Sequence, residues 1–202
     1  MGFLEELKQQ RLDDHRYYHQ SRVNQSLHFF SALSFLSAYI LLTVNLVAAV
    51  FIGWVVAMVS RQAGHFFFEP KGYDKINQAT FEYKERIKVG YNLRRKVILL
   101  SAWALSPAVL YHNPTLFGLL EAHQHWKGYL HNVAVVWLSL GIGALLFRTV
   151  HLFFIKDMQS GLVWLTKILT DPFHDVVLYH KAPIHLLKGE KLDPMKHVSS
   201  GA

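Results

Sequence analysis

The sequence contains no cysteine, which excludes disulfide bonds and thiolate metal sites. Charged residues are also absent over a long stretch, because there is no Asp, Glu, Lys or Arg from Leu27 to Ser60. One membrane-spanning helix needs about 20 apolar residues. This stretch is too long for a single span, and it predicts a tight hairpin of two helices that turns at Thr43 to Asn45.

Two further apolar blocks follow, Val97 to Tyr111 and Tyr129 to Ile155. The first is short and contains Pro107, so we expect a kinked or partly re-entrant segment there. The sequence therefore predicts an all-α fold. We expect a polytopic membrane helix bundle of about four membrane segments, with additional interfacial helices.

The positive charge of the chain lies outside the apolar blocks. The formal net charge is +7, residues 66–96 hold twice as many basic as acidic residues, and the tail after Ile155 is again rich in lysine. In the connection 112–128, Lys127 is the only Lys or Arg. The positive-inside rule then predicts that both termini and the 66–96 loop are cytoplasmic. Basic sequence at this position favours anionic lipid headgroups, and we expect no nucleic-acid partner.

We expect a single domain over the 202 residues. The expected parts are an interfacial N-terminal segment 1–23, a membrane hairpin 24–69, a basic cytoplasmic loop 70–96, two further membrane segments within 97–155, and a cytoplasmic or interfacial tail 156–202. In the tail, an interfacial helix is expected over Gly161 to Asp171, followed by a segment punctuated by proline. Such a protein would reside in the inner membrane of a bacterium or the endoplasmic reticulum of a eukaryote.

The chain has 13 histidines, and imidazole is the commonest metal ligand in proteins. The predicted hairpin sorts them by depth. His28 precedes the turn and His65 follows it by similar distances along the two helices, so both return to the same membrane face. His19 converges with His28 only if the chain bends between them, and the segment QSRVN provides that break.

The same depth argument selects His151, about one turn before the last apolar block ends at Ile155. Arg148 lies three residues earlier on the same helix stripe. An arginine inside a membrane marks a functional site by default, here with a fatty-acid carboxylate as its partner, although a snorkelling arginine is the alternative. Glu69 follows His65 by four residues and would share its helix face.

Neutral histidines with at most one carboxylate and no thiolate suit Fe(II), Zn or Mn. Histidines at a membrane boundary also serve simply to hydrogen-bond backbone or lipid headgroups. The fourth ligand is left open among Glu69, His151 and three of the histidines in the tail, His174, His180 and His185.

Two segments, YHQSRVNQSLH at residues 18–28 and GHFFFEP at residues 64–70, together resemble the Mpo-type 2-hydroxy fatty acid dioxygenase family. That family shows Tyr-His, an Asn five residues after the His, a second His four residues further on, and later Gly-His followed by Glu. The matching residues are Tyr18, His19, Asn24, His28, Gly64, His65 and Glu69. The resemblance covers about residues 17–75.

The resemblance implies an integral membrane, Fe(II)-dependent dioxygenase that shortens 2-hydroxy fatty acids by one carbon with O2 and without an organic cosubstrate. Iron held by His19, His28 and His65 would be chelated by the carboxylate and the 2-hydroxyl of the substrate. Glu69 would be a fourth ligand or would orient an imidazole. The acyl chain would lie among the helices, and the candidates to hold the carboxylate are Arg148, Arg61 and Arg22.

This sequence departs from the family in having a shorter connection between the second His and the Gly-His, and in having no match over residues 96–202. The sequence also bears on three other functions. A di-iron hydroxylase or desaturase is disfavoured, because the sequence has no HxxHH box. A membrane cytochrome with haem between histidines such as His28 and His151 or His65, and a scaffold protein that docks a partner on its basic loop, remain open.

Overall fold

The computed structural model describes residues 1–195, and within that range every regular element is a helix. The elements are α1 (Phe3–Tyr18), α2 (Arg22–Leu41), α3 (Leu46–Phe51), η1 (Ile52–Met58), α4 (Val59–Ala63), η2 (Gly64–Phe68), α5 (Phe81–Ile87), α6 (Leu93–His112), α7 (Trp126–Ile155), α8 (Met158–Tyr179) and α9 (Ala182–Leu187). The two η elements are π-helical turns. The all-helical prediction is confirmed.

The hairpin forms where the sequence predicts it. Ser21 caps α2, because its Oγ accepts a hydrogen bond from the Asn24 backbone N–H at 3.4 Å. At the other end of α2 the chain turns, and the Oδ1 of Asn45 accepts from the Ala48 N–H at 3.0 Å to cap α3. The second arm then runs without interruption from Leu46 to Phe68 and ends before Pro70, as expected.

Two helical segments within residues 1–195 are long and apolar enough to cross a membrane, Leu46–Phe68 and α7. Only 22% and 28% of their most apolar windows are buried inside the protein, whereas the core helix of a soluble protein would be mostly buried. The helix α2 is not apolar enough to be counted with them, because polar side chains such as Asn24, Gln25 and Ser31 line its buried face. The four-span arrangement and the cytoplasmic termini stay predictions.

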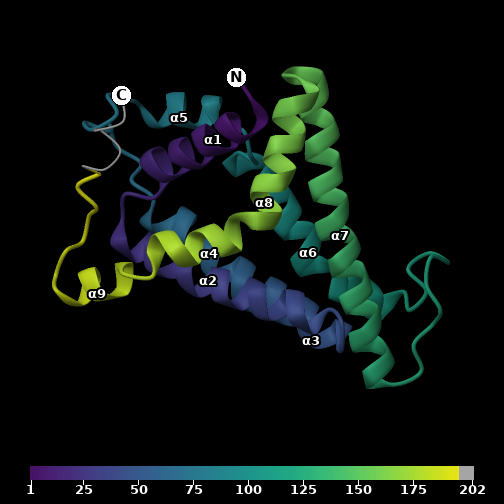
Figure 1. The fold of residues 1–202 in the computed structure, drawn as a ribbon. Coiled ribbons are helices and arrows are strands. Elements are labelled where there is room, and N and C mark those ends of the chain that lie inside the picture. The colour runs from purple at the N-terminus through teal and green to yellow at the C-terminus, as the bar shows by residue number, and fades with distance from the viewer. Residues whose placement is uncertain (196–202) are drawn as a thin grey trace.

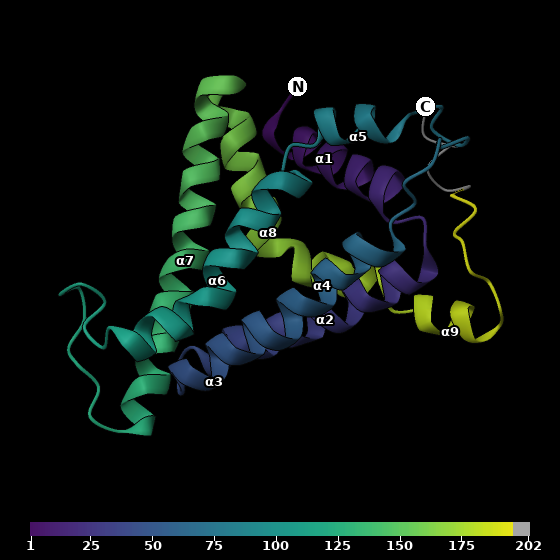
Figure 2. The same cartoon turned by 180° about the vertical axis from the view of Figure 1, so that it is seen from behind.

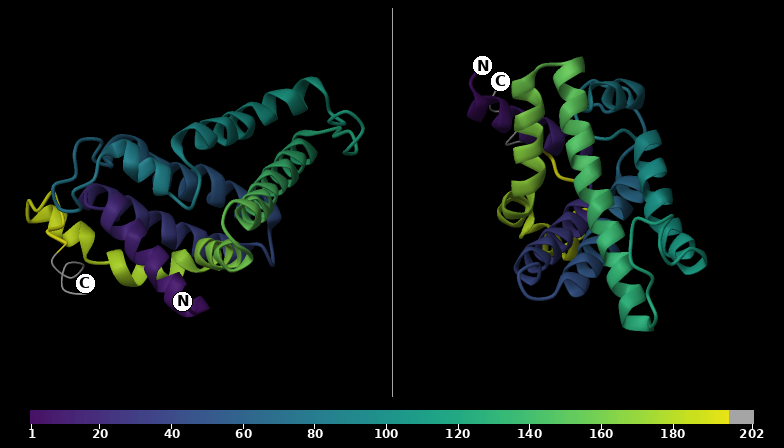
Figure 3. Two further views of the ribbon diagram at one scale, coloured as in Figure 1. Left: turned by 90° about the horizontal axis from the view of Figure 1, so that it is seen from above. Right: turned by 90° about the vertical axis from the view of Figure 1, so that its right-hand side faces the viewer.

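The helices α6 and α7 form an antiparallel pair whose connection lies at the end far from α1 (Figure 3). In Figures 1 and 2 the helix α8 first returns along α7 and then bends to run along α2. It packs against α1, α2 and α7. The expected end of this helix near Asp171 is wrong, because α8 continues through Pro172 to Tyr179. Proline lacks an N–H and collides with the preceding turn, which is the usual cause of such a bend.

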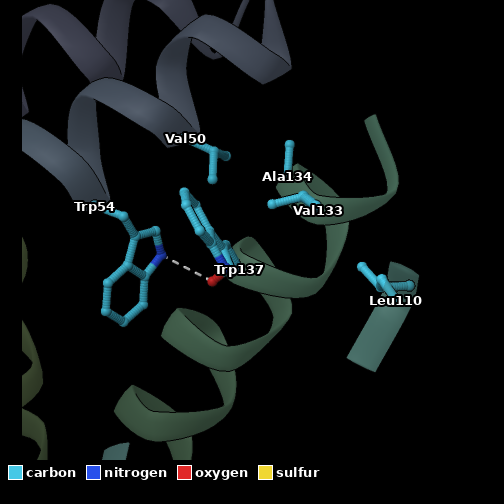
Figure 4. Close-up of a cluster of buried hydrophobic side chains, with 6 residues drawn as sticks. All are labelled: Val50, Trp54, Leu110, Val133, Ala134 and Trp137. Atoms are coloured by element: carbon cyan, nitrogen blue, oxygen red, sulfur yellow. Dashed lines mark hydrogen bonds between the residues drawn. The ribbon is translucent and has the colours of Figure 1, made fainter. Parts of the chain in front are cut away.

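A buried apolar cluster joins the hairpin to the α6–α7 pair (Figure 4). Its fully buried members are Val50, Trp54, Leu110, Val133, Ala134 and Trp137. The indole N–H of Trp54 donates to the Trp137 carbonyl at 2.9 Å, and the indole N–H of Trp137 donates to Ser106 Oγ at 3.0 Å. Both tryptophans thus bury their rings with their polar groups satisfied, which fixes η1 against α7.

The basic loop is less helical than expected. The sequence predicts a helix within residues 77–96 that ends at Gly90, whereas α5 begins at Phe81 after its cap Thr80 and ends at Ile87. The next helix, α6, begins at Leu93, before the expected start of the third apolar block, and continues through Pro107.

Candidate metal centre

Three histidines from three separate elements meet at one point. His19 directly follows the last residue of α1, His28 lies on α2, and His65 lies on η2. Their ligand atoms all lie within 4.8 Å of one another. The ring centroids are 4.1 Å apart for His19 and His28, 5.1 Å for His19 and His65, and 4.9 Å for His28 and His65. The convergence that the sequence predicts is present in the structure.

The break between α1 and α2 aims His19 inward. His19 leaves the helical conformation with φ −122° and ψ 36°, and its backbone carbonyl accepts from Gln25 Nε2 at 2.7 Å. Asn24 Nδ2 donates to the Tyr18 carbonyl at 2.8 Å. The first turn of α2 therefore holds the last residues of α1 through side-chain amides, and this contact gives Asn24 a structural role.

Gly64 allows η2 to approach α2 closely enough to bring His65 to His28. A Cβ atom on residue 64 would lie 2.1 Å from Oδ1 and 3.1 Å from Cγ of Asn24. Asn24 is fully buried. Cβ contacts below 3.0 Å essentially never occur, so a side chain at position 64 would force Asn24 or the helix to move. Asn24 of the segment 18–28 and Gly64 of the segment 64–70 are thus in direct contact.

Each imidazole presents its Nδ1 to an acceptor outside the cluster. His19 Nδ1 donates to the Asp14 carbonyl at 2.9 Å, and His65 Nδ1 donates to Glu69 Oε2 at 2.8 Å. His28 Nδ1 faces Asp175 Oδ2 at 3.6 Å. Metal-bound histidines are commonly held in this way, by a carbonyl or carboxylate on the nitrogen that does not bind the metal. The Nε2 atoms of His19 and His28 face each other inside the cluster.

The donor set fits a metal ion. His19 Nε2 and His28 Nε2 lie 3.1 Å apart. With a proton on each Nδ1, both Nε2 atoms of the neutral rings carry lone pairs, which repel each other at this distance. Two imidazole nitrogens at about 2.0–2.1 Å from one ion would lie about 3–3.4 Å apart, so a cation would relieve the repulsion with little movement.

The same geometry keeps His19 neutral. Burial lowers the pKa of His19 well below its usual value, and the neighbouring His28 lowers it further. A neutral imidazole is the form that binds a metal. His65 is the exposed edge of the cluster, with 11% of its side chain accessible, while His19 and His28 are at most 1% accessible.

Glu69 lies behind His65, where it orients the imidazole, and it is not one of the residues whose ligand atoms converge. Of the two roles expected for Glu69, this geometry supports the orienting one. Burial raises the pKa of Glu69, although the ammonium groups of Lys88 and Lys96 act in the opposite direction. Lys88 Nζ lies 3.8 Å from Glu69 Oε2.

The structure does not bring Arg148 or His151 to the histidine cluster. Arg148 Nη1 donates to His151 Nδ1 at 2.8 Å, and Arg148 Nε donates to the Val89 carbonyl at 3.0 Å. His151 is not among the converging histidines. The depth argument failed for these two residues because it fixes only the level along the membrane normal, while α8 packs between α2 and α7.

Within residues 1–195, the tail histidines His174, His180 and His185 are not among the converging residues either. His180 Nδ1 contacts the carbonyl of Val177 in its own helix at 2.8 Å, and His185 pairs with Glu190 at the surface. The tail contributes other residues, which the sequence reasoning missed. Asp175 faces His28, and the buried ring of Tyr179 lies 5.7 Å from that of His19. The available signal was the spacing of four residues from Asp171 to Asp175 to Tyr179, which aligns all three on one helix face.

A buried ion-pair network borders the cluster. Its members are Arg11, Asp14, Arg61, Lys167, Asp171 and Asp175. Lys167 Nζ lies 3.1 Å from Asp14 Oδ2 and 2.6 Å from Asp171 Oδ2, and Arg61 Nη1 lies 3.1 Å from Asp175 Oδ2. Burial raises the pKa of Asp14, but Lys167 and other cations outweigh it and hold this pKa well below the usual range. The network therefore stays ionised and fastens α1, α4 and α8 together.

A cavity of about 890 Å³ opens beside His65. Cationic and polar side chains line it near the cluster, among them Arg61, Gln62, Lys88 and Lys96. Apolar side chains of the hairpin, α6 and α7 line another part, among them Trp54, Met58, Leu99, Leu100, Leu138 and Ile142. The volume is that of a small-molecule site, and the lining suits a ligand with an anionic head and an apolar tail.

Comparisons of the chain with family models, with curated proteins and with solved structures gave no match. The family resemblance therefore stays a prediction.

Proposed function

We propose that this protein is an Fe(II)-dependent membrane dioxygenase that shortens 2-hydroxy fatty acids by one carbon. The observation that carries the proposal is the convergence of three imidazoles whose Nδ1 atoms face acceptors outside the cluster. His19, His28 and His65 would hold the iron. Three neutral protein ligands leave further positions open, and iron bound there would supply the centre at which O2 oxidises a chelating 2-hydroxy acid.

The site belongs at the cytoplasmic boundary of the membrane. The segment Leu46–Phe68 and α7 would cross the bilayer, because they expose apolar side chains such as Val55, Phe147 and Phe154. His65 lies less than one turn from the end of its span, next to the charged network of α1 and α8. This position lets a lipid substrate reach the cluster from the bilayer while its carboxylate stays near the aqueous face.

The cavity accounts for the substrate class. Arg61 is fixed by Asp175 and lines the cavity with Lys96, so both present positive charge near His65. Arg148 does not line the cavity, and Arg22 is paired with Asp193 at 3.0 Å. Of the three arginines considered for the carboxylate, Arg61 is therefore the one in position.

The residues around the cluster each have a defined task. Glu69 and the Asp14 carbonyl keep His65 and His19 in one tautomer and orientation, and the Asp175 carboxylate faces His28 Nδ1 at 3.6 Å. The burial of His19 and His28 keeps bulk water away from two sides of the site. The balanced reaction converts a 2-hydroxy acid and O2 into an acid one carbon shorter, CO2 and water, so it needs no further reductant.

The haem alternative fits this geometry less well. Two axial nitrogens on opposite sides of one haem iron would lie about 4 Å apart with the porphyrin between them. His151 does not converge with His28, and the rings of His28 and His65 have centroids 4.9 Å apart, with His19 Nε2 only 3.1 Å from His28 Nε2. The scaffold alternative predicts no bound metal at all.

Metal analysis of protein purified in detergent tests the proposal. We expect close to one iron per chain in the wild type and almost none in the double variant His28→Ala, His65→Ala. His180→Ala is the matched control, because His180 is exposed and its Nδ1 donates to the Val177 carbonyl of its own helix. Full iron occupancy in the double variant would refute the metal site.

The reaction is tested separately with 2-hydroxy fatty acids in air and without oxygen. We expect an equimolar loss of O2 and gain of the acid one carbon shorter, both abolished in the double variant. An iron-containing protein that consumes no O2 with any 2-hydroxy fatty acid would contradict the proposed reaction while leaving the metal site in place.

A further inference from the structure

One helix residue leaves space in the apolar part of the cavity. Gly141 lines the cavity from α7, where its neighbours in the lining include Leu138, Ile142 and Leu145. In the described part of the chain, Gly141 is the only α7 residue of this lining without a side chain. A Cβ atom on residue 141 would lie 3.6 Å from Trp54 Cζ2. That is ordinary van der Waals contact, so a larger side chain here would extend toward or into the cavity.

The wall opposite Gly141 is rigid. The Trp54 ring is 7% exposed, donates its N–H to the Trp137 carbonyl at 2.9 Å, and stacks on Trp103 with centroids 5.6 Å apart and planes at 13°. A side chain that satisfies its polar group and packs on two others is held in a single rotamer. The space between Trp54 and residue 141 is therefore set by the size of the residue at position 141.

This space lies away from the end of the cavity that is lined by Arg61 and Lys96. Trp54 stands on the same continuous helix as Arg61 and His65, about two turns or about 10 Å from Arg61 and about three turns or about 16 Å from His65. A ligand whose carboxylate lies near Arg61 and Lys96 would bring only the distal part of its chain to Trp54.

We propose that Gly141, against the fixed ring of Trp54, determines the length of the acyl chain that the cavity accepts. This inference rests on the proposed function in taking the ligand to be a long-chain carboxylic acid. It adds a specificity-determining residue on α7, in the part of the chain that the family resemblance does not cover.

The test compares Gly141→Leu with Gly143→Leu. Gly143 is exposed on the same helix, and a Cβ atom there would meet nothing within 4 Å, so both variants make the same change in helix propensity. Binding of a homologous series of saturated fatty acids to purified, iron-free protein is measured by competition with a fluorescent fatty acid. Using iron-free protein separates chain-length selection from catalysis.

A leucine side chain adds four carbon atoms of bulk, so the longest acid that binds with full affinity should be shorter by about three to four carbons in Gly141→Leu. Longer acids should bind at least about tenfold more weakly, while short acids and the Gly143→Leu control should match the wild type. An unchanged profile, or an equal loss at every chain length, would overturn the inference.

Gly141→Ala provides a second variant if Gly141→Leu does not fold, because the added methyl group fits at 3.6 Å without displacement. Its expected shift is about one carbon. A shift in chain length without any iron-dependent oxidation would support the role of Gly141 and reject the proposed function. Oxidation of 2-hydroxy acids with no shift would do the reverse.

Discussion

The contact between Gly64 and Asn24 yields a sharp prediction, because a single methyl group should disturb the metal centre. In Gly64→Ala the new Cβ would lie 2.1 Å from Asn24 Oδ1, against a lower limit of 3.0 Å for real contacts, so the atoms must separate by at least 0.9 Å. Asn24 cannot turn away freely, because it is fully buried and its Nδ2 donates to the Tyr18 carbonyl. The displacement therefore moves η2, and His65 with it.

A metal site tolerates about 0.2 Å of error in its ligand distances, so a shift near 1 Å should remove His65 from the cluster. We expect iron affinity to fall by at least about tenfold to a hundredfold. Overpacking a tight contact typically costs about 1–3 kcal/mol, part of which is offset by about 1 kcal/mol from the better helix propensity of alanine.

Gly53→Ala is the matched control. Gly53 stands on the same continuous helix, and a Cβ atom there would lie 3.9 Å from Ala38 Cβ, which is ordinary contact. Iron titration and thermal unfolding in detergent are measured for both variants. We expect Gly53→Ala to bind iron like the wild type and to unfold at the same or a higher temperature.

Combining Gly64→Ala with Asn24→Ala tests the mechanism itself. Truncation of Asn24 removes the two colliding atoms and leaves its Cα at 3.6 Å from the new methyl group. The double variant should therefore bind iron more tightly than Gly64→Ala alone. Wild-type iron affinity in Gly64→Ala, or strictly additive effects of the two substitutions, would refute the reasoning.

Further predictions concern the groups around the cluster. Glu69→Gln should lower iron affinity about tenfold, because the orienting carboxylate behind an imidazole becomes a neutral amide, whereas the exposed Glu82→Gln should not. Lys167→Met should destabilise the fold by about 3 kcal/mol in thermal or denaturant unfolding, because the buried Asp171 loses its shortest ion pair and the partly exposed Asp14 loses its partner, whereas Lys156→Met at the surface should change little. Burial and the neighbouring ammonium group lower the pKa of Lys96 to about 8, so Lys96 is charged below that pH and neutral above it. Fatty-acid affinity should then fall as the pH rises through about 8, and Lys96→Arg should flatten this dependence because arginine stays protonated.

Each of these outcomes has a clear opposite. Equal iron affinity in Glu69→Gln and the wild type would show that the contact with His65 is incidental. A stable Lys167→Met variant would mean that the two carboxylates find other partners. A pH profile that is the same in Lys96→Arg would assign the titration to another group.

The part of the site that the sequence predicts is the part governed by local signals. Polar residues interrupt the apolar stretch at Thr43 to Asn45, and the helix rise of about 1.5 Å per residue then fixes the relative depth of His28 and His65. The break after Tyr18 is equally local. These signals give the turn, the two arms and the convergence of the histidines.

What the sequence could not predict depends on lateral packing. His151 has a suitable depth, but α8 packs against both α2 and α7, so depth alone does not bring it to the cluster. The same helix supplies Asp175 and Tyr179, which stayed hidden because Pro172 indicated the end of a helix. The helix α8 bends at the proline instead, and the bend directs its C-terminal part toward α2 (Figure 1).

The charges around the cluster indicate the class of ligand that completes it. In the ion-pair network three carboxylates face three cations, and Glu69 has Lys88 at 3.8 Å. The imidazoles themselves are neutral, and within residues 1–195 the adjacent carboxylates of Glu69 and Asp175 already face Lys88 and Arg61, so a divalent ion among the histidines would add two uncompensated charges. An isolated charge in a buried site is costly, which favours an anionic ligand that reaches the ion from the cavity. A carboxylate whose apolar chain extends toward Trp54 meets both requirements, while a neutral lipid would meet only the second.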